Sequence, residues 1–247
     1  MQRSAPAVPG PGWLRPLVLA LAVLAAGLLA GRAGAQADWE RVNVLAGLQP
    51  PSNSIDDRSQ RIDVGGKTYL LSALRAPIDR GVVRNAKVIY LDRFPPGLEL
   101  FRDDMETFHF MVHQGGVLLL VCGGSTPQAV ADNFNYLGTR FDFEFLADTG
   151  PGVIRPERPR QGPLGGDAWQ CDRGIRPLRL GAGDWRVDYR HPATGQPVAA
   201  SLRIGQGILY LVGTDELNRT SEGVEQSALT LVEWCRQEIR RLPTPLP

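Results

Sequence analysis

The stretch GGVLLLVCGGSTPQ, residues 115–128, decides the fold. Residues 117–121 are apolar on both faces of a strand, which is typical of a central strand in a parallel sheet covered by helices on each side. Cys122 and two glycines follow, and Ser125-Thr126-Pro127 has the chemistry of an N-cap and a first helical residue. The stretch therefore predicts a strand, a glycine turn and a helix. The turn lies at the strand end where open α/β sheets bind ligands.

The residues before this stretch predict further strands and a helix. Residues 39–48 and 86–91 have the pattern of strands, whereas residues 67–74 fit either a strand or a short helix. Residues 98–114 repeat apolar side chains at spacings of three and four, which predicts an amphipathic helix.

The residues after it predict a helix, an edge strand, an insertion and a closing hairpin and helix. Residues 127–137 have helical periodicity, and residues 141–146 alternate apolar and charged side chains as an edge strand does. Residues 148–183 are rich in Pro, Gly and Arg, which predicts an irregular insertion rather than a second domain. Residues 184–212 give strand patterns at hairpin spacing, and residues 222–241 carry an apolar helical stripe.

The first 35 residues have the composition of an export signal. Arg3 and Arg15 stand before and beside an apolar stretch over residues 17–30, and Ala33-Gly34-Ala35 offers small residues at a cleavage site. Because the apolar stretch is short for a membrane span, we expect a cleaved signal peptide and a periplasmic protein. An uncleaved inner-membrane anchor is the alternative.

Composition limits what the rest of the chain does. Residues 38–242 fit one domain, followed by a tail at residues 243–247. The formal net charge of +1 gives no electrostatic basis for binding nucleic acid. Three cysteines are too few for a disulfide scaffold. Cys171 and Cys235 are a candidate pair in an oxidising compartment, which would leave Cys122 free.

Short motifs recur in an order that resembles a known superfamily. After GGVLL come NFNYLG (133–138), GQPV (195–198), GQGILYLVG (205–213) and LVEW (231–234). Over residues 41–241 this order resembles the class I glutamine amidotransferase-like superfamily. More narrowly, it is similar to the domains of that group in bacterial membrane-associated and gliding or transport accessory proteins, and in an intraflagellar-transport subunit. The resemblance implies an α/β three-layer sandwich of flavodoxin-like kind, with a mainly parallel central sheet and a late β-hairpin.

The resemblance also supplies a catalytic hypothesis. Catalytic members place a Cys in the strand-to-helix elbow and pair it with a His and a Glu, and Cys122 stands in that position. A thiol needs an adjacent base or a positive field to become a thiolate. At the place of the family's His this chain has Gly213-Thr214-Asp215-Glu216, and His191 lies a hairpin too early. We therefore expect a non-catalytic domain, with a Cys-dependent hydrolase or amidotransferase using Cys122 as the alternative.

Two other groups of residues are candidate sites. Backbone N–H groups at a helix start attract anions, and neighbouring strand ends meet at the same edge of a parallel sheet. These arguments give a candidate site for a small polar ligand formed by Gly123, Gly124, Ser125, Thr126, Asp92, Arg93, Thr214 and Asp215. The spacing of Glu106, His109 and His113 puts them along one helical face, where they form a candidate metal site or a solvated surface.

These observations predict an exported, non-catalytic module that binds or scaffolds a partner. The expected partner is a membrane-associated protein or a small polar ligand. No cofactor and no nucleic acid is expected.

Overall fold

The computed structural model describes residues 41–46, 60–64, 67–94, 98–157, 168–215 and 224–241. All the described residues belong to one compact unit of the chain, Arg41–Pro247. The signal segment predicted at residues 1–35 lies outside them. Within the described ranges, no helix is both long and apolar enough to cross a membrane.

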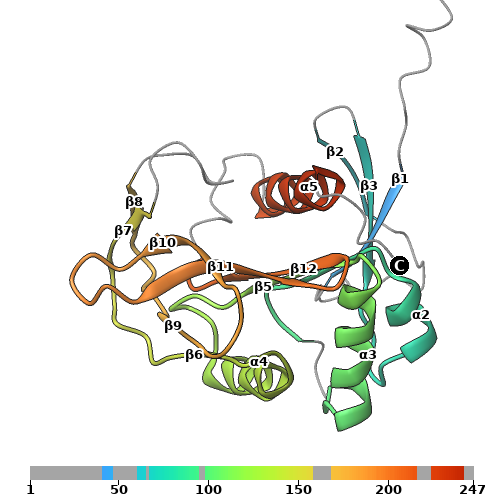
Figure 1. Ribbon diagram of the computed structural model, residues 1–247, viewed down its shortest axis with the longest axis horizontal. Helices are drawn as coiled ribbons and strands as arrows, with labels where there is room; N and C mark the ends of the chain where they lie inside the picture. The colour runs from blue at the N-terminus through green and yellow to red at the C-terminus, as the bar shows by residue number, and fades with distance from the viewer. Residues whose placement is uncertain are drawn as a thin grey trace, which may run out of the picture. The chain divides into compact units, whose positions relative to one another are not determined.

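A ten-stranded sheet forms the centre of the unit, with the order β2-β3-β1-β4-β5-β12-β11-β10-β7-β8 (Figure 1). The strands are β1 (Arg41–Ala46), β2 (Gln60–Val64), β3 (Lys67–Ala73), β4 (Val88–Leu91), β5 (Val117–Val121), β7 (Gly152–Pro156), β8 (Trp169–Cys171), β10 (Arg186–Arg190), β11 (Pro197–Ile204) and β12 (Gly207–Val212). β3, β1, β4, β5 and β12 are parallel, and the strands on both sides of this block pair antiparallel. The sheet is therefore mixed rather than mainly parallel as predicted.

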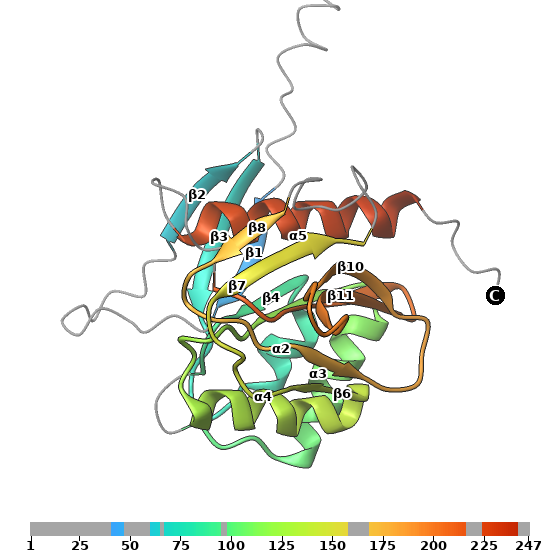
Figure 2. The ribbon, with the colours of Figure 1, turned by 90° about the vertical axis from the view of Figure 1, so that its left-hand side faces the viewer.

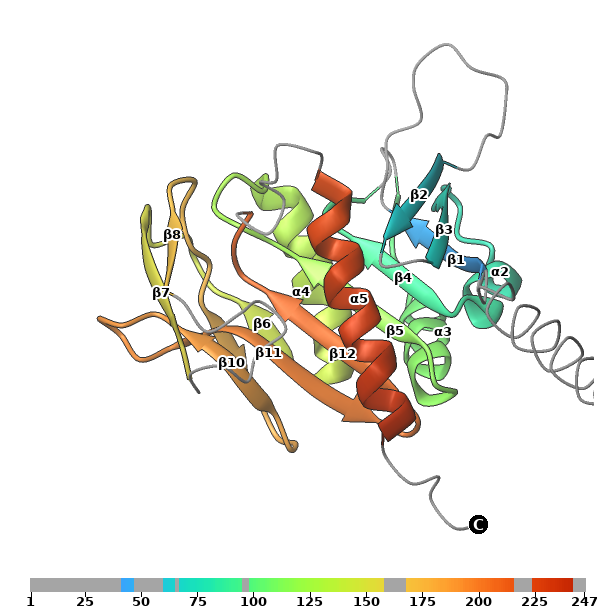
Figure 3. The same ribbon diagram turned by 90° about the horizontal axis from the view of Figure 1, so that it is seen from above.

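Helices cover both faces of this sheet, which confirms the layered α/β architecture. α2 (Arg80–Asn85), α3 (Arg102–His113) and α4 (Gln128–Phe141) lie on one face, and α5 (Val224–Arg241) crosses the other (Figures 1 and 3). Alternate residues of β5 enter the two cores. Val117, Leu119 and Val121 belong to the core under α5, and Leu118, Leu120 and Cys122 to the opposite one. β5 is buried on both faces, as its unbroken apolar run requires.

The strands before β5 settle a question that the sequence left open. Residues 67–74, which fitted either element type, form the strand β3, and β1 and β4 confirm the strands predicted at residues 39–48 and 86–91. β3 pairs with β1 in parallel and with β2 as an antiparallel hairpin.

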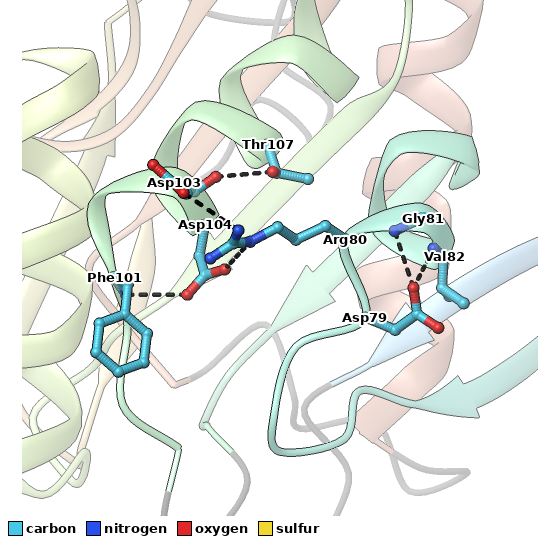
Figure 4. A network of polar contacts seen from close by, with 8 residues as sticks. All are labelled: Asp79, Arg80, Gly81, Val82, Phe101, Asp103, Asp104 and Thr107. Atoms are coloured by element: carbon cyan, nitrogen blue, oxygen red, sulfur yellow. Dashed lines mark hydrogen bonds and ion pairs between the residues drawn. The ribbon is translucent and has the colours of Figure 1, made fainter.

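A polar network fixes α2 against α3 (Figure 4). Asp79 caps α2 by accepting two backbone N–H groups of its first turn. Next to it, Arg80 donates from Nε to Asp104 (2.8 Å) and from Nη1 to Asp103 (3.2 Å) at the start of α3. The other oxygen of Asp104 accepts the N–H of Phe101, so this buried carboxylate is bonded on both sides. One carboxylate thus caps α3 and holds α2.

The described residues of the insertion predicted as irregular form three strands. β7 and β8 extend the main sheet to its edge (Figure 2), and β9 (Leu178–Leu180) forms a separate two-stranded ribbon with β6 (Phe143–Phe145). Ile154, Cys171 and Ile175 from this segment are buried in the core under α5. The sequence pattern did not predict these strands, because each contributes only one or two apolar side chains to the core.

The ribbon also corrects the edge strand predicted at residues 141–146. This segment ends α4 and then forms β6, which lies beside α4 rather than in the main sheet (Figure 1). The side chain of Asn135 accepts the N–H of Phe145 (2.7 Å) and donates to its carbonyl (3.0 Å), as a neighbouring strand would. A Cβ at Gly138 would lie 2.3 Å from the carbonyl oxygen of Phe143, so this close approach requires glycine. Asn135 and Gly138 both belong to the NFNYLG motif.

Candidate functional site

The elbow between β5 and α4 is the turn that the sequence singled out. The N–H of Thr126 bonds to the carbonyl of Gly123 (3.1 Å), and Pro127 precedes α4 with an extended ψ of 144°. Pro127 itself occupies the N-cap position and makes no side-chain cap. The prediction that Ser125-Thr126 would cap the helix is therefore wrong, because the hydroxyl of Ser125 has another partner.

That partner is Asp215, which follows the carboxyl end of β12. Its Oδ2 accepts the backbone N–H of Ser125 (2.9 Å) and the hydroxyl of the same residue. Asp215 is 8% exposed, and a Cβ at Gly123 would lie 2.3 Å from its Cγ. The carboxylate of Asp215 thus bonds to a backbone N–H group that the sequence assigned to an external anion.

Arg176 closes the elbow from the other side. Its guanidinium donates to the carbonyl of Gly123 (3.0 Å), to that of Thr126 (3.2 Å) and to the side chain of Gln128 (3.3 Å). Its backbone N–H bonds to the carbonyl of Gly213 (2.8 Å), where a Cβ would lie 1.9 Å from the carbonyl oxygen of Arg176. Arg176 is 5% exposed. Sequence reasoning missed it, because it is one of several arginines in a segment without periodicity.

Cys122 lies behind this closed turn. Its side chain is fully buried, and its backbone N–H continues the ladder to Val212 (2.9 Å). Burial is the main cause that raises the pKa of the thiol to about 12; the charge of Arg176 and a hydrogen bond with Thr126 lower it by less, and the Asp215 carboxylate has the smallest effect, which raises it. A nucleophilic cysteine needs the reverse, a thiol whose pKa is lowered towards neutrality.

None of the interactions of Cys122 with the described residues involves a histidine. His109 contacts Arg140, His113 stacks against His109 at 6.4 Å between ring centroids, and His191 accepts a backbone N–H from its own hairpin turn. Glu216, the last residue of the segment where the family places its base, lies outside the described residues. Within the described part of the chain, Cys122 is therefore not paired with a histidine.

The other residues of the predicted polar-ligand site have partners of their own. Arg93 donates from Nε and Nη2 to the carboxylate of Asp92 (3.1 and 3.0 Å) at the end of β4. Thr214 is fully buried and forms an isolated bridge with Ile175. Gly124 packs against the insertion, where a Cβ would lie 2.3 Å from the carbonyl oxygen of Arg173.

An arginine stands among the three side chains of the candidate metal site, Glu106, His109 and His113. Arg140 on α4 approaches Glu106 as an ion pair (Nε to Oε1, 3.0 Å) without a well-aligned hydrogen bond, and its Nη2 lies 3.3 Å from Nδ1 of His109. Burial and the charge of Arg140 lower the pKa of His109. Throughout the described ranges, no group of three His, Cys, Asp or Glu side chains is placed to hold a metal ion.

All three cysteines are buried thiols outside any disulfide. Cys171 and Cys235, the candidate disulfide pair, belong to the same core under α5 as separate thiols.

Solved structures show what this chain is similar to, whereas no family model and no curated protein matches its sequence. A structure titled mmIFT52 N-terminal domain has a TM-score of 0.52 at 12% identity, over 72% of this chain and 87% of that one. The chain shares the fold of that domain. At this identity the likeness shows the fold alone.

Two further matches are weaker. Cytoplasmic protein STM1381 from Salmonella typhimurium LT2 has a TM-score of 0.49 at 13% identity, over 78% of this chain and 93% of that one. The β-galactosidase from Bacillus circulans sp. alkalophilus has a TM-score of 0.44 at 14% identity. This match covers 72% of the present chain and 26% of the enzyme, so the chain spans about a quarter of that protein's length.

Proposed function

We propose that this protein is an exported, non-catalytic module of amidotransferase-like fold that binds or scaffolds a membrane-associated protein or a small polar ligand. One observation carries the non-catalytic part: the elbow that would hold a nucleophile is filled by the chain's own Asp215 and Arg176, with Cys122 buried behind it. Export to the periplasm, or anchoring in the inner membrane, is supported by the pattern of residues 1–35.

The closed elbow has a structural role under this proposal. It ties the end of β5 to the residues after β12 through Asp215, and to the insertion through Arg176. Oxyanion stabilisation requires free N–H donors aimed at the reacting oxygen, whereas the N–H of Ser125 already donates to the carboxylate of Asp215. The elbow therefore acts as a clamp between three segments that are distant in sequence.

The resemblance to domains of membrane-associated and transport accessory proteins supports a partner-binding role. The fold similarity to the mmIFT52 N-terminal domain is compatible with it, although at 12% identity that similarity concerns the fold alone. The competing proposal is a Cys-dependent hydrolase or amidotransferase, and the two differ on the reactivity of Cys122.

Alkylation by iodoacetamide distinguishes them. With a thiol pKa of about 12, about one Cys122 in ten thousand is a thiolate at about pH 8, even before access is considered. We expect Cys122 to stay unmodified in the native protein between about pH 7 and pH 9 and to react fully in urea. Peptide-resolved mass spectrometry measures this, with the buried Cys171 and Cys235 as internal references.

A native Cys122 that reacts faster than the same residue in the unfolded chain would establish an activated thiol and favour the hydrolase. The variant Cys122→Ala supplies the control. Under our proposal it retains partner or ligand binding, because the thiol lies in the core and contacts no surface.

A further inference from the structure

A groove separate from the elbow runs between α4 and the β6–β9 ribbon. Its volume is about 640 Å³, within the range of about 300–1,000 Å³ typical of small-molecule sites. The side chains that matter for its chemistry are Tyr136, Thr139, Asp142, Glu144, Arg179 and Leu180. None of them takes part in the clamp around Cys122.

The walls of this groove are fixed before any ligand arrives. Asn135 binds both backbone groups of Phe145, which locks β6 against α4. At the end of the groove Asp142 adopts a left-handed conformation, with φ of 61°, and its Oδ2 accepts the N–H of Ala182 (2.6 Å). The carbonyl of Asp142 accepts the N–H of Gly181 (2.8 Å). A preformed site loses little conformational entropy on binding.

An aromatic ring stands at the wall of the groove. Tyr136 on α4 is 42% exposed, one of four large apolar side chains exposed among the described residues. Its hydroxyl has no hydrogen-bond partner within the described ranges. The ring therefore offers a flat apolar face and a free polar tip, the combination that makes tyrosine common in binding sites.

Each charged side chain in the groove already has a partner. Glu144 and Arg179 lie opposite each other in the ribbon and form an ion pair, and the carboxylate of Asp142 is bonded to a backbone N–H. The groove has two carboxylates and one guanidinium, so its charge disfavours a phosphate. A ligand amine is also disfavoured, because both carboxylates already have hydrogen-bond or ion-pair partners. The guanidinium still has N–H donors to spare and the carboxylates still have lone pairs. Such groups suit hydroxyls, which donate and accept at once.

We propose that this groove binds a neutral, hydroxyl-rich ligand, a sugar ring of an oligosaccharide. One face of the sugar ring packs on the aromatic ring of Tyr136, and the hydroxyls of the sugar bond to the Glu144–Arg179 pair and to Asp142. The proposal rests on the proposed function in one respect, that the module acts by binding.

Ligand binding by the full chain tests this site. The probes are maltotriose, cellotriose and a β-1,4-linked galactotriose as neutral oligosaccharides, with inorganic phosphate and spermidine as charged ones. Saturation-transfer NMR and calorimetry should show binding of at least one trisaccharide, and Tyr136→Ala should weaken it by about tenfold or more. Phe110→Ala is the matched control, because Phe110 is similarly exposed (47%) but lies on α3, outside the groove.

Three results would overturn the proposal. They are no binding of any trisaccharide at about 10 mM, equal binding by Tyr136→Ala and the wild type, and tighter binding of phosphate or spermidine than of every trisaccharide. An unchanged melting temperature of Tyr136→Ala shows that the loss is local. If no sugar binds but Cys122 is inert to alkylation, the proposed function stands and only the sugar site is refuted. A reactive Cys122 would overturn the proposed function without affecting the sugar measurement.

Discussion

Arg176→Met removes the guanidinium that closes the elbow and keeps an unbranched side chain in its place. In the native protein Arg176 is 5% exposed and donates to two carbonyl oxygens within 3.2 Å, those of Gly123 and Thr126. Methionine fills the space without replacing these bonds, so buried acceptors lose their partner. We expect a loss of unfolding free energy without a change of fold.

The size of this loss follows from the two shortest bonds. Hydrogen bonds of a charged group contribute about 1.5–3 kcal/mol each, so the loss of these two in Arg176→Met should cost about 3–6 kcal/mol. For a domain of this size that corresponds to a melting temperature lowered by about 6–24 °C. Urea and thermal unfolding followed by far-UV circular dichroism measure both quantities, and an unchanged urea slope shows that the unfolded state is the same.

Arg179→Met is the matched control for this variant. The guanidinium of Arg179 is 68% exposed and, among the described residues, pairs with the partly exposed Glu144 alone, so its removal should cost about 0–1 kcal/mol. If Arg176→Met is no more destabilising than Arg179→Met, the guanidinium does not hold the elbow, and the account of the clamp fails.

Three further substitutions probe the α4 side of the molecule. Asn135→Ala leaves the backbone groups of Phe145 without partners and should cost about 2 kcal/mol in urea unfolding, whereas a neutral outcome would mean that water replaces the amide. Gly138→Ala places a Cβ against the carbonyl of Phe143 and should cost about 1–3 kcal/mol despite the better helix propensity of alanine; a stabilised variant would contradict the close packing. Because burial lowers the pKa of His109 below 6.5, the unfolded chain binds more protons there, so stability should fall as the pH drops from about 7.5 to about 5.5. His109→Gln should flatten this dependence of the urea midpoint on pH, and an equally steep dependence would assign it to other groups.

The sequence predicted the elements whose pattern is local. The apolar run of β5 and the helical stripe of α3 can each be recognised from a few neighbouring residues, and both elements form as predicted. The periodicity of residues 222–241 likewise becomes α5 over Val224–Arg241. The mixed character of the sheet was not predicted, because β7 and β8 are short and lie in a segment rich in Pro and Gly.

The elbow was predicted as a turn but not as a closed one. Its occupation depends on Asp215, 90 residues after Ser125, and on Arg176, about fifty residues after the carbonyls that it binds. Neither pairing leaves a local signal in the sequence. The contact between Arg140 and His109 likewise has no local signal, since Arg140 comes from a different helix than His109.

Amide hydrogen exchange at Ser125 tests most directly whether the chain fills its own elbow. Its N–H bonds to the carboxylate of Asp215 at 2.9 Å, so it should exchange as slowly as the N–H of Cys122, which bonds within the sheet. Asp215→Ala should release the amide of Ser125 while leaving that of Cys122 protected. An amide of Ser125 that exchanges as fast as an open loop in the wild type would show a free donor at the elbow and contradict the non-catalytic account.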